Sequence, residues 1–81
     1  MATQRAQLTI TIRGKTATFP TDVTVEADGR IRFVVPSGRI VPGTDATIKL
    51  TLNGKDIPVT GASRFNPGQE VTVSASGAVV G

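Results

Sequence analysis

Carboxylates are the side chains of this sequence that best suit acid–base catalysis or metal binding, but their positions point to structural roles. The six carboxylates are Asp22, Glu26, Asp28, Asp45, Asp56 and Glu70. Asp28 and Asp56 lie in or beside predicted tight turns, where aspartate accepts local backbone hydrogen bonds. A glycosidase needs two carboxylates that face each other across a cleft, and a domain of 81 residues has little room for one. The sequence also lacks the D-x-D-x-D-G pattern of a calcium loop.

The side chains that usually activate a nucleophile for catalysis are missing from this sequence. The chain contains no cysteine and no histidine, so thiolate chemistry, the commonest general base and the commonest metal ligand are all missing. The serines have no histidine to activate them, and no S-x-x-K spacing offers a lysine in its place. No glycine-rich phosphate-binding pattern is present. We therefore expect no enzymatic activity, no cofactor and no metal.

A net charge of +3 suits binding to nucleic acid or to another acidic surface. The lysines and arginines are scattered rather than clustered. Barrels that bind single strands stack bases on aromatic side chains, and this chain has three phenylalanines and no tyrosine or tryptophan. Phe19 and Phe33 are predicted to face the core, which leaves Phe65, beside Arg64, as the candidate exposed aromatic.

Membrane and export signals are not evident in the sequence. No apolar run approaches the ~20 residues that a membrane-spanning helix needs. No apolar segment follows Met1–Arg5, so we expect neither a signal peptide nor membrane association.

The elements that position these side chains are predicted to be strands, because apolar and polar residues alternate along most of the chain. Leu8, Ile10 and Ile12 alternate with polar residues, and Gly14-Lys15 is interpreted as a type II′ turn. That turn pairs Ile12 with Ala17 and Ile10 with Phe19. Pro20 is predicted to end the second strand.

Two further hairpins follow from turn residues. A three-residue loop over residues 27–29, with Gly29 left-handed, pairs Val25 with Ile31 and Val23 with Phe33. Asn53-Gly54 predicts a type I′ turn. That turn pairs Leu50 with Ile57 and Ile48 with Val59, and it places Pro58 on an edge.

The remaining elements are a turn, a strand and a connection. Asn66–Gln69 indicates a type II turn, and a last strand follows with Val71 and Val73 facing inward. Pro36–Thr44 is predicted to be a long crossover loop. We predict one all-β domain over residues 1–81, an antiparallel sandwich or barrel of six to eight strands built from hairpins. Residues 1–6 are interpreted as a flexible arm and residues 77–81 as an edge strand or a frayed tail.

The segment Phe65–Val73 resembles the Pro-Gly turn into a strand of immunoglobulin-like domains, although the cysteines and tryptophan of antibody domains are absent. The whole profile, which is free of cysteine and rich in threonine, valine and glycine, resembles the small β proteins that decorate the capsids of tailed bacteriophages. The latter resemblance implies a structural protein of the virion. It assigns no role to a particular residue.

The leading functional hypothesis is a non-enzymatic module that stabilises a larger protein assembly, such as a capsid shell, as a monomer or a homo-oligomer. The expected location is then the virion, and otherwise the cytoplasm. The alternatives are a basic, OB-like protein that binds single-stranded nucleic acid and an immunoglobulin-like adhesion or carbohydrate-binding module. The candidate partner contacts are Gln4, Arg5, Arg39, Ile40, Val41, Arg64 and Phe65. Ile40 and Val41 could equally cap the end of the core.

Overall fold

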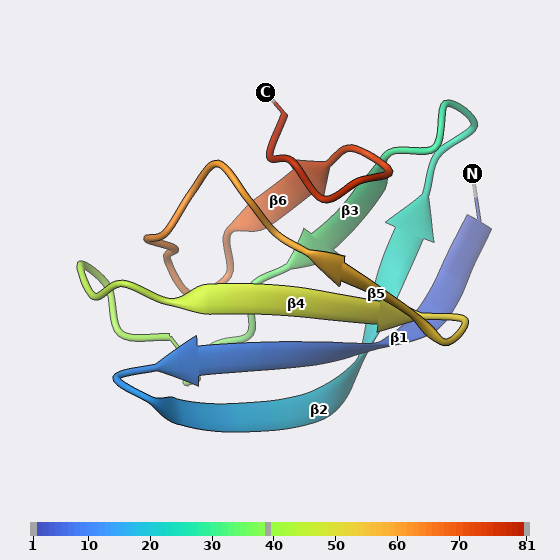
Figure 1. Ribbon diagram of the computed structural model, residues 1–81. Helices are drawn as coiled ribbons and strands as arrows, with labels where there is room; N and C mark the ends of the chain where they lie inside the picture. The colour runs from blue at the N-terminus through green and yellow to red at the C-terminus, as the bar shows by residue number, and fades with distance from the viewer. Residues whose placement is uncertain (1, 39, 81) are drawn as a thin grey trace.

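A computed structural model describes residues 2–38 and 40–80, which form one antiparallel sheet without helices (Figure 1). Its strands are β1 (Ala2–Ile12), β2 (Lys15–Val25), β3 (Ile31–Val34), β4 (Thr47–Leu52), β5 (Lys55–Pro58) and β6 (Glu70–Val73). The spatial order of the six strands is β5-β4-β1-β2-β3-β6. The prediction of an all-β fold built from hairpins is confirmed.

The sheet curls into a half-barrel rather than forming two facing layers (Figure 1). Every second side chain of a strand points to the concave side, and these inward positions supply the core. Phe33, Leu8, Ile48 and Leu50 are the largest fully buried side chains. The sandwich or barrel that we expected is not confirmed: the six strands form one curled sheet, in which the two long strands β1 and β2 lie at the centre.

The turn between β1 and β2 lies one residue earlier than predicted. Arg13 and Gly14 are the central residues, with φ of 53° and 77°, which is the type I′ geometry. Ile12 therefore pairs with Lys15, and Ile10 with Ala17. A type I′ turn matches the twist of the flanking strands, and this preference outweighs the cost of a positive φ at arginine. The observed pairing differs from the predicted pairing by two residues along β2. Because side chains alternate between faces with a period of two, the same residues of β2 still face inward.

Two sequence predictions about β1 and β2 are wrong. β2 continues through Pro20, which lies opposite Gln7 in the pairing with β1. Residues Ala2–Ala6, predicted to be an arm, form the first half of β1 and pair with Thr21–Val25. Proline ends a strand only where its missing N–H belongs to the ladder. The nitrogen of Pro20 faces away from β1, because Pro20 is an even number of residues from Thr24, which pairs with β3.

The turns of the two later hairpins agree with the sequence predictions. Val25 pairs with Ile31, and Gly29 has a φ of 89°. The predicted pair of Val23 with Phe33 is not formed, because the pairing of β2 with β3 ends at Thr24 and Arg32. Leu50 pairs with Ile57 across the Asn53-Gly54 turn, in which the two φ values are 53° and 78°. Pro58 lies on β5, the edge strand, as expected.

Connections and the C-terminal segment complete the half-barrel. The Gln69 N–H donates to the Asn66 carbonyl at 3.1 Å, and Gly68 has a φ of 79°, which confirms the type II turn. The C-terminal segment bridges β6 to the residues that follow β5. There the Val79 N–H donates to Thr60 and the Val80 N–H to Thr72, both at 2.9 Å. The described part of this segment is therefore hydrogen-bonded rather than frayed.

Candidate functional site

The two candidate contacts on β1 are engaged within the chain. Arg5 forms an ion pair with Asp22 at 3.1 Å on the outer face of the sheet. The side-chain oxygen of Gln4 accepts a hydrogen bond from the amide of Asn53 at 3.2 Å. Both residues lie toward the β4–β5 turn, at the end of β1 that is far from the β1–β2 turn. They do not form one patch with the loop candidates.

The loop candidates divide into buried and exposed residues. Phe65 is 2% exposed, so the prediction that it is an exposed aromatic is wrong. Ile40 is also buried, whereas Val41 is 53% exposed. Arg64 is exposed and forms an ion pair with Asp45 at 3.1 Å. Arg39 lies outside the described residues.

The burial of Phe65 follows from contacts that are distant in sequence. The Ala46 N–H donates to the Ser63 carbonyl at 2.7 Å, and the Val35 N–H donates to the Gln69 carbonyl at 2.8 Å. These bonds attach the segment 61–69 to the residues at both ends of the 36–44 connection. Phe65 is thereby placed in the core with Ile40.

Ion pairs occupy all six side-chain carboxylates, which lie in the described part of the chain. The pairs are Arg5–Asp22, Arg30–Asp28, Arg32–Glu26, Arg32–Glu70, Lys49–Asp56 and Arg64–Asp45, with distances from 3.1 to 3.8 Å. Exposed pairs of this kind stabilise a fold little. They do neutralise charge locally, so the positive charge of the described surface is concentrated on the cations that remain unpaired.

Three described cations have no carboxylate partner. Arg13 and Lys15 flank Gly14 in the β1–β2 turn, and Lys55 follows Gly54 in the β4–β5 turn. All three side chains are exposed. The two turns lie at opposite ends of the sheet, because β4 runs antiparallel to β1 with Thr47 opposite Thr11. The β1–β2 end thus carries two adjacent unpaired cations, and the other end carries one.

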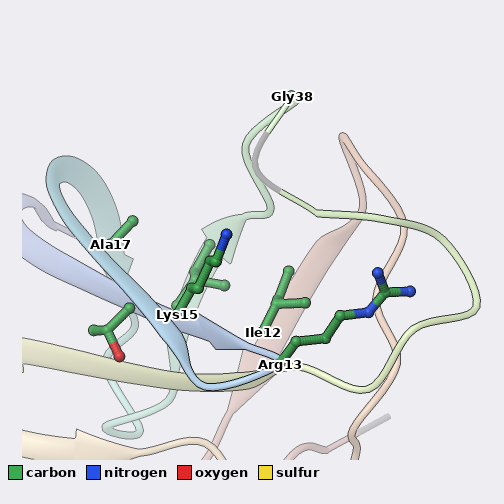
Figure 2. A pocket seen from close by; sticks show the side chains of 7 residues that line it. Ile12, Arg13, Lys15, Ala17 and Gly38 are labelled. Carbon is green, nitrogen blue, oxygen red and sulfur yellow. The ribbon is translucent and has the colours of Figure 1, made fainter.

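A pocket of about 390 Å³ opens beside these two cations. Ile10, Ile12 and Ala17 contribute apolar side chains to it, and Arg13 and Lys15 border it. In Figure 2 the side chains of Ile12, Lys15 and Ala17 point toward the segment that carries Gly38. We call this surface, formed by the pocket with Arg13 and Lys15, the basic end.

The outer face of the sheet carries rows of threonine. Thr9 and Thr18 lie opposite each other with their hydroxyl oxygens 3.0 Å apart, and Thr11 and Thr16 with theirs 2.9 Å apart. Each hydroxyl already has a hydrogen-bond partner within the chain. Threonine is also favoured on a half-exposed strand face for reasons of packing. The basic end is therefore the better candidate for a binding surface than this face.

In the described ranges 2–38 and 40–80, no group of three or more acidic side chains is placed to hold a metal ion. The same residues contain no helix that is long and apolar enough to cross a membrane.

Sequence reasoning missed Arg13 and Lys15 because it assigned a turn to Gly14-Lys15 and treated the cations as scattered. The signal was present in part: Arg13 and Lys15 are close in sequence, and no carboxylate precedes Asp22. Their lack of partners becomes visible only when the register shows which carboxylates the other cations occupy. Comparison with protein-family models, with curated proteins and with solved structures found no match to this chain.

Proposed function

We propose that this chain is a non-enzymatic binding module that attaches through its basic end to a larger protein assembly, such as a capsid shell. The observation that supports the proposal is the pairing of charges. Every side-chain carboxylate is occupied, while Arg13 and Lys15 have no carboxylate partner in the described part of the chain and lie beside an open apolar pocket. A partner that offers acidic and apolar side chains complements both features.

The two features of the basic end make different contributions to binding. Exposed cations raise the association rate and the specificity of binding more than the affinity. An apolar side chain buried in the pocket supplies affinity, because the buried centre of an interface contributes most of the binding energy. The 36–44 connection, whose Gly38 borders the pocket, also carries the exposed Val41. Val41 offers a second apolar contact for the partner.

A shell-like assembly suits a module with one small contact surface. A symmetric shell presents the same site many times, and a homo-oligomer of the chain would engage several sites together. The effective concentration that such linkage creates strengthens weak single contacts without any new contact. On this proposal the chain is located in the virion.

Binding to single-stranded nucleic acid is the second candidate, and the unpaired cations favour it. The aromatic side chains do not, because Phe33 and Phe65 are both 2% exposed and base stacking needs exposed rings. Phe19 is half-buried on β2. This distribution places protein assembly ahead of nucleic acid.

A sedimentation experiment tests the proposal. The purified chain is mixed with the particle fraction of its native source and centrifuged, with and without prior nuclease digestion. We expect saturable sedimentation that survives nuclease, and cross-links from Lys15 to one shell protein. Sedimentation that nuclease abolishes, or no sedimentation at any ratio of chain to particle, contradicts the proposal.

Salt dependence separates the two candidate functions in the same assay. Binding to nucleic acid falls steeply as salt rises, because each neutralised phosphate releases counterions. Binding to a protein surface through two cations and an apolar pocket should depend on salt weakly. A steep loss of binding to the particles favours the nucleic-acid alternative.

A further inference from the structure

Most of β2, from Lys15 to Val23, is a strand edge with a neighbour on one side only. β2 pairs with β1 over its full length, whereas it pairs with β3 only at Thr24 and Val25. From Lys15 to Val23, no described strand lies along the other side of β2 (Figure 1). This open edge ends at the basic end of the half-barrel, because Lys15 follows the β1–β2 turn.

The direction of the backbone groups follows from the register. In an antiparallel pair, successive residues direct their N–H and C=O groups alternately toward and away from the partner strand. Thr24 pairs with Arg32 of β3, and the Glu26 N–H donates to the Arg30 carbonyl at 2.8 Å. Residues of β2 with even numbers therefore face away from β1. Along the open edge these residues are Thr16, Thr18, Pro20 and Asp22.

Pro20 fits this alternation of backbone groups, because a proline is tolerated in an edge strand where its nitrogen faces the open side. The edge thus presents the N–H groups of Thr16, Thr18 and Asp22, together with the carbonyl groups of all four residues. Such an edge is a template for a further strand. Strand addition of this kind is a recurrent mode of peptide recognition.

The pocket lies beside the open edge. It therefore determines which kinds of side chain an added strand should direct toward it. Ala17 points to the pocket side of β2 and is exposed, and Ile10 and Ile12 line the pocket beside it. A strand laid against β2 would direct every second side chain to this side. Apolar side chains at those positions would cover the exposed apolar surface.

The charge at the basic end determines the remaining side chains of the added strand. Arg13 and Lys15 lack carboxylate partners among residues 2–38 and 40–80, and both border the pocket. A strand that ends in acidic residues at this position would complete two ion pairs. Such pairs also exclude strands that carry lysine or arginine there, since like charges repel.

A second copy of this chain is a poor occupant of the edge. Any two-fold pairing of β2 with β2 that spans Thr16 to Asp22 includes Pro20 twice, and each proline leaves one carbonyl of the other copy without a donor. Both copies also carry a net charge of +3. Proline and lysine on an edge strand oppose self-association for these reasons.

We propose that the open edge of β2 accepts an extended segment of a partner protein whose pocket-facing side chains are apolar beside Ala17 and acidic beside Lys15, which lies on the same face. The segment adds a strand along Thr16–Asp22, places an apolar side chain in the pocket and pairs its carboxylates with Arg13 and Lys15. This inference rests on the proposed function, because it names the chemical class of the segment that the basic end binds.

A synthetic peptide provides the test. The probe is the acetylated, amidated hexapeptide Glu-Glu-Val-Thr-Val-Thr, in which the first glutamate and both valines share one face, titrated into isotopically labelled protein and followed by amide NMR. We expect saturable shifts at the amides of Thr16, Thr18 and Asp22. A peptide with lysine in place of glutamate should not bind. A probe methylated on the amides that face β2 should bind roughly tenfold more weakly, since each net hydrogen bond contributes modestly.

A substitution in the protein also tests whether backbone hydrogen bonds of β2 hold the probe. Thr18→Pro removes an N–H that faces the open side of β2. The ladder with β1 stays intact, because the nitrogen of residue 18 faces away from β1, as the nitrogen of Pro20 does. We expect roughly tenfold weaker binding of the probe. Thr18→Ala is the matched control, since it removes the same hydroxyl contact with Thr9 but keeps the N–H. It should bind the probe as the parent chain does.

Three outcomes overturn strand addition. They are equal binding of the methylated and unmethylated probes, shifts confined to residues outside Thr16–Asp22, and no binding of the acidic probe at all. The methylated probe needs no protein variant, so the test holds even if Thr18→Pro fails to fold. Strand addition fails alone if the chain still sediments with particles while the acidic probe does not bind. The proposed function fails alone if the probe binds as expected and no particle does.

Discussion

Replacing Gly77 with alanine should release the C-terminal segment from the half-barrel. Gly77 is buried with a φ of 100°. A Cβ atom built at this position would overlap the carbonyl oxygen of Pro58 and lie 2.9 Å from its carbonyl carbon. The obstacle is backbone of β5, which cannot rotate away as a side chain can. The segment itself must therefore move.

The expected loss of stability is about 3 kcal/mol. Forcing alanine into a left-handed conformation costs roughly 1 kcal/mol or more. Movement of the segment breaks the hydrogen bonds between Thr60 and both Gly77 and Val79, which contribute about 1 kcal/mol each. In a domain of this size, a loss of about 3 kcal/mol lowers the melting temperature by about 12–24 °C.

Gly68→Ala is the matched control, and circular dichroism during heating is the assay. Gly68 has a φ of 79° and no atom within 4 Å of a built Cβ, so only the conformational cost of roughly 1 kcal/mol applies. That cost corresponds to about 4–8 °C. Equal melting temperatures for the two variants would refute the reasoning, because the difference between them measures the contact with Pro58.

Three further predictions concern the core and the turns. Phe33→Ala should lower the free energy of unfolding by roughly 3–5 kcal/mol, because Phe33 is 2% exposed in the core; a urea titration that finds a loss under ~1 kcal/mol contradicts this placement. Gly54→Val should cost more than ~1 kcal/mol because Gly54 has a φ of 78°, whereas Gly54→Asn should cost less; equal urea midpoints for the two variants would count against the turn. Arg13→Asn should stabilise the fold by about 0.5–1 kcal/mol, because asparagine tolerates the φ of 53° found at Arg13; a lower melting temperature would oppose the type I′ assignment.

Local turn chemistry explains why much of the fold was predictable. Asn53-Gly54 and the loop that ends at Gly29 each fix a register by themselves, and the structure has both. Short-range signals of this kind determine which residues of a hairpin face inward. They do not determine how hairpins join, and the single curled sheet depends on the pairing of β4 with β1, which are far apart in the sequence.

Pro20 and Phe65 show where local reasoning fails. The effect of a proline in a strand depends on which side its nitrogen faces, and the register of β1 with β2 decides this. Phe65 lies in an irregular segment without alternation, and it is buried by contacts between this segment and residues that precede β4. Neither property can be obtained from the neighbouring residues alone.

The basic end was hidden from sequence reasoning for a related reason. A cation is notable only when no carboxylate lies near it, and half of the ion pairs join residues that are distant in sequence, such as Arg5 with Asp22 and Arg64 with Asp45. Arg5 was proposed as a partner contact because it lies in a segment predicted to be a flexible arm, and Arg64 because it neighbours Phe65. The structure instead pairs both arginines with carboxylates and leaves Arg13 and Lys15 without partners among the described residues.

The two turn lysines allow the most direct test of the central claim, which is that binding occurs at the basic end. Lys15 and Lys55 each follow the glycine of a type I′ turn, and each is exposed and unpaired among the described residues. Lys15→Glu and Lys55→Glu therefore change charge equally in matching local structures at opposite ends of the sheet. The measurement is the affinity of each variant for the particles in the sedimentation assay. We predict that Lys15→Glu binds at least roughly tenfold more weakly, as the loss of about 1.4 kcal/mol implies, while Lys55→Glu binds as the parent chain does. Equal affinities of the two variants would contradict the claim.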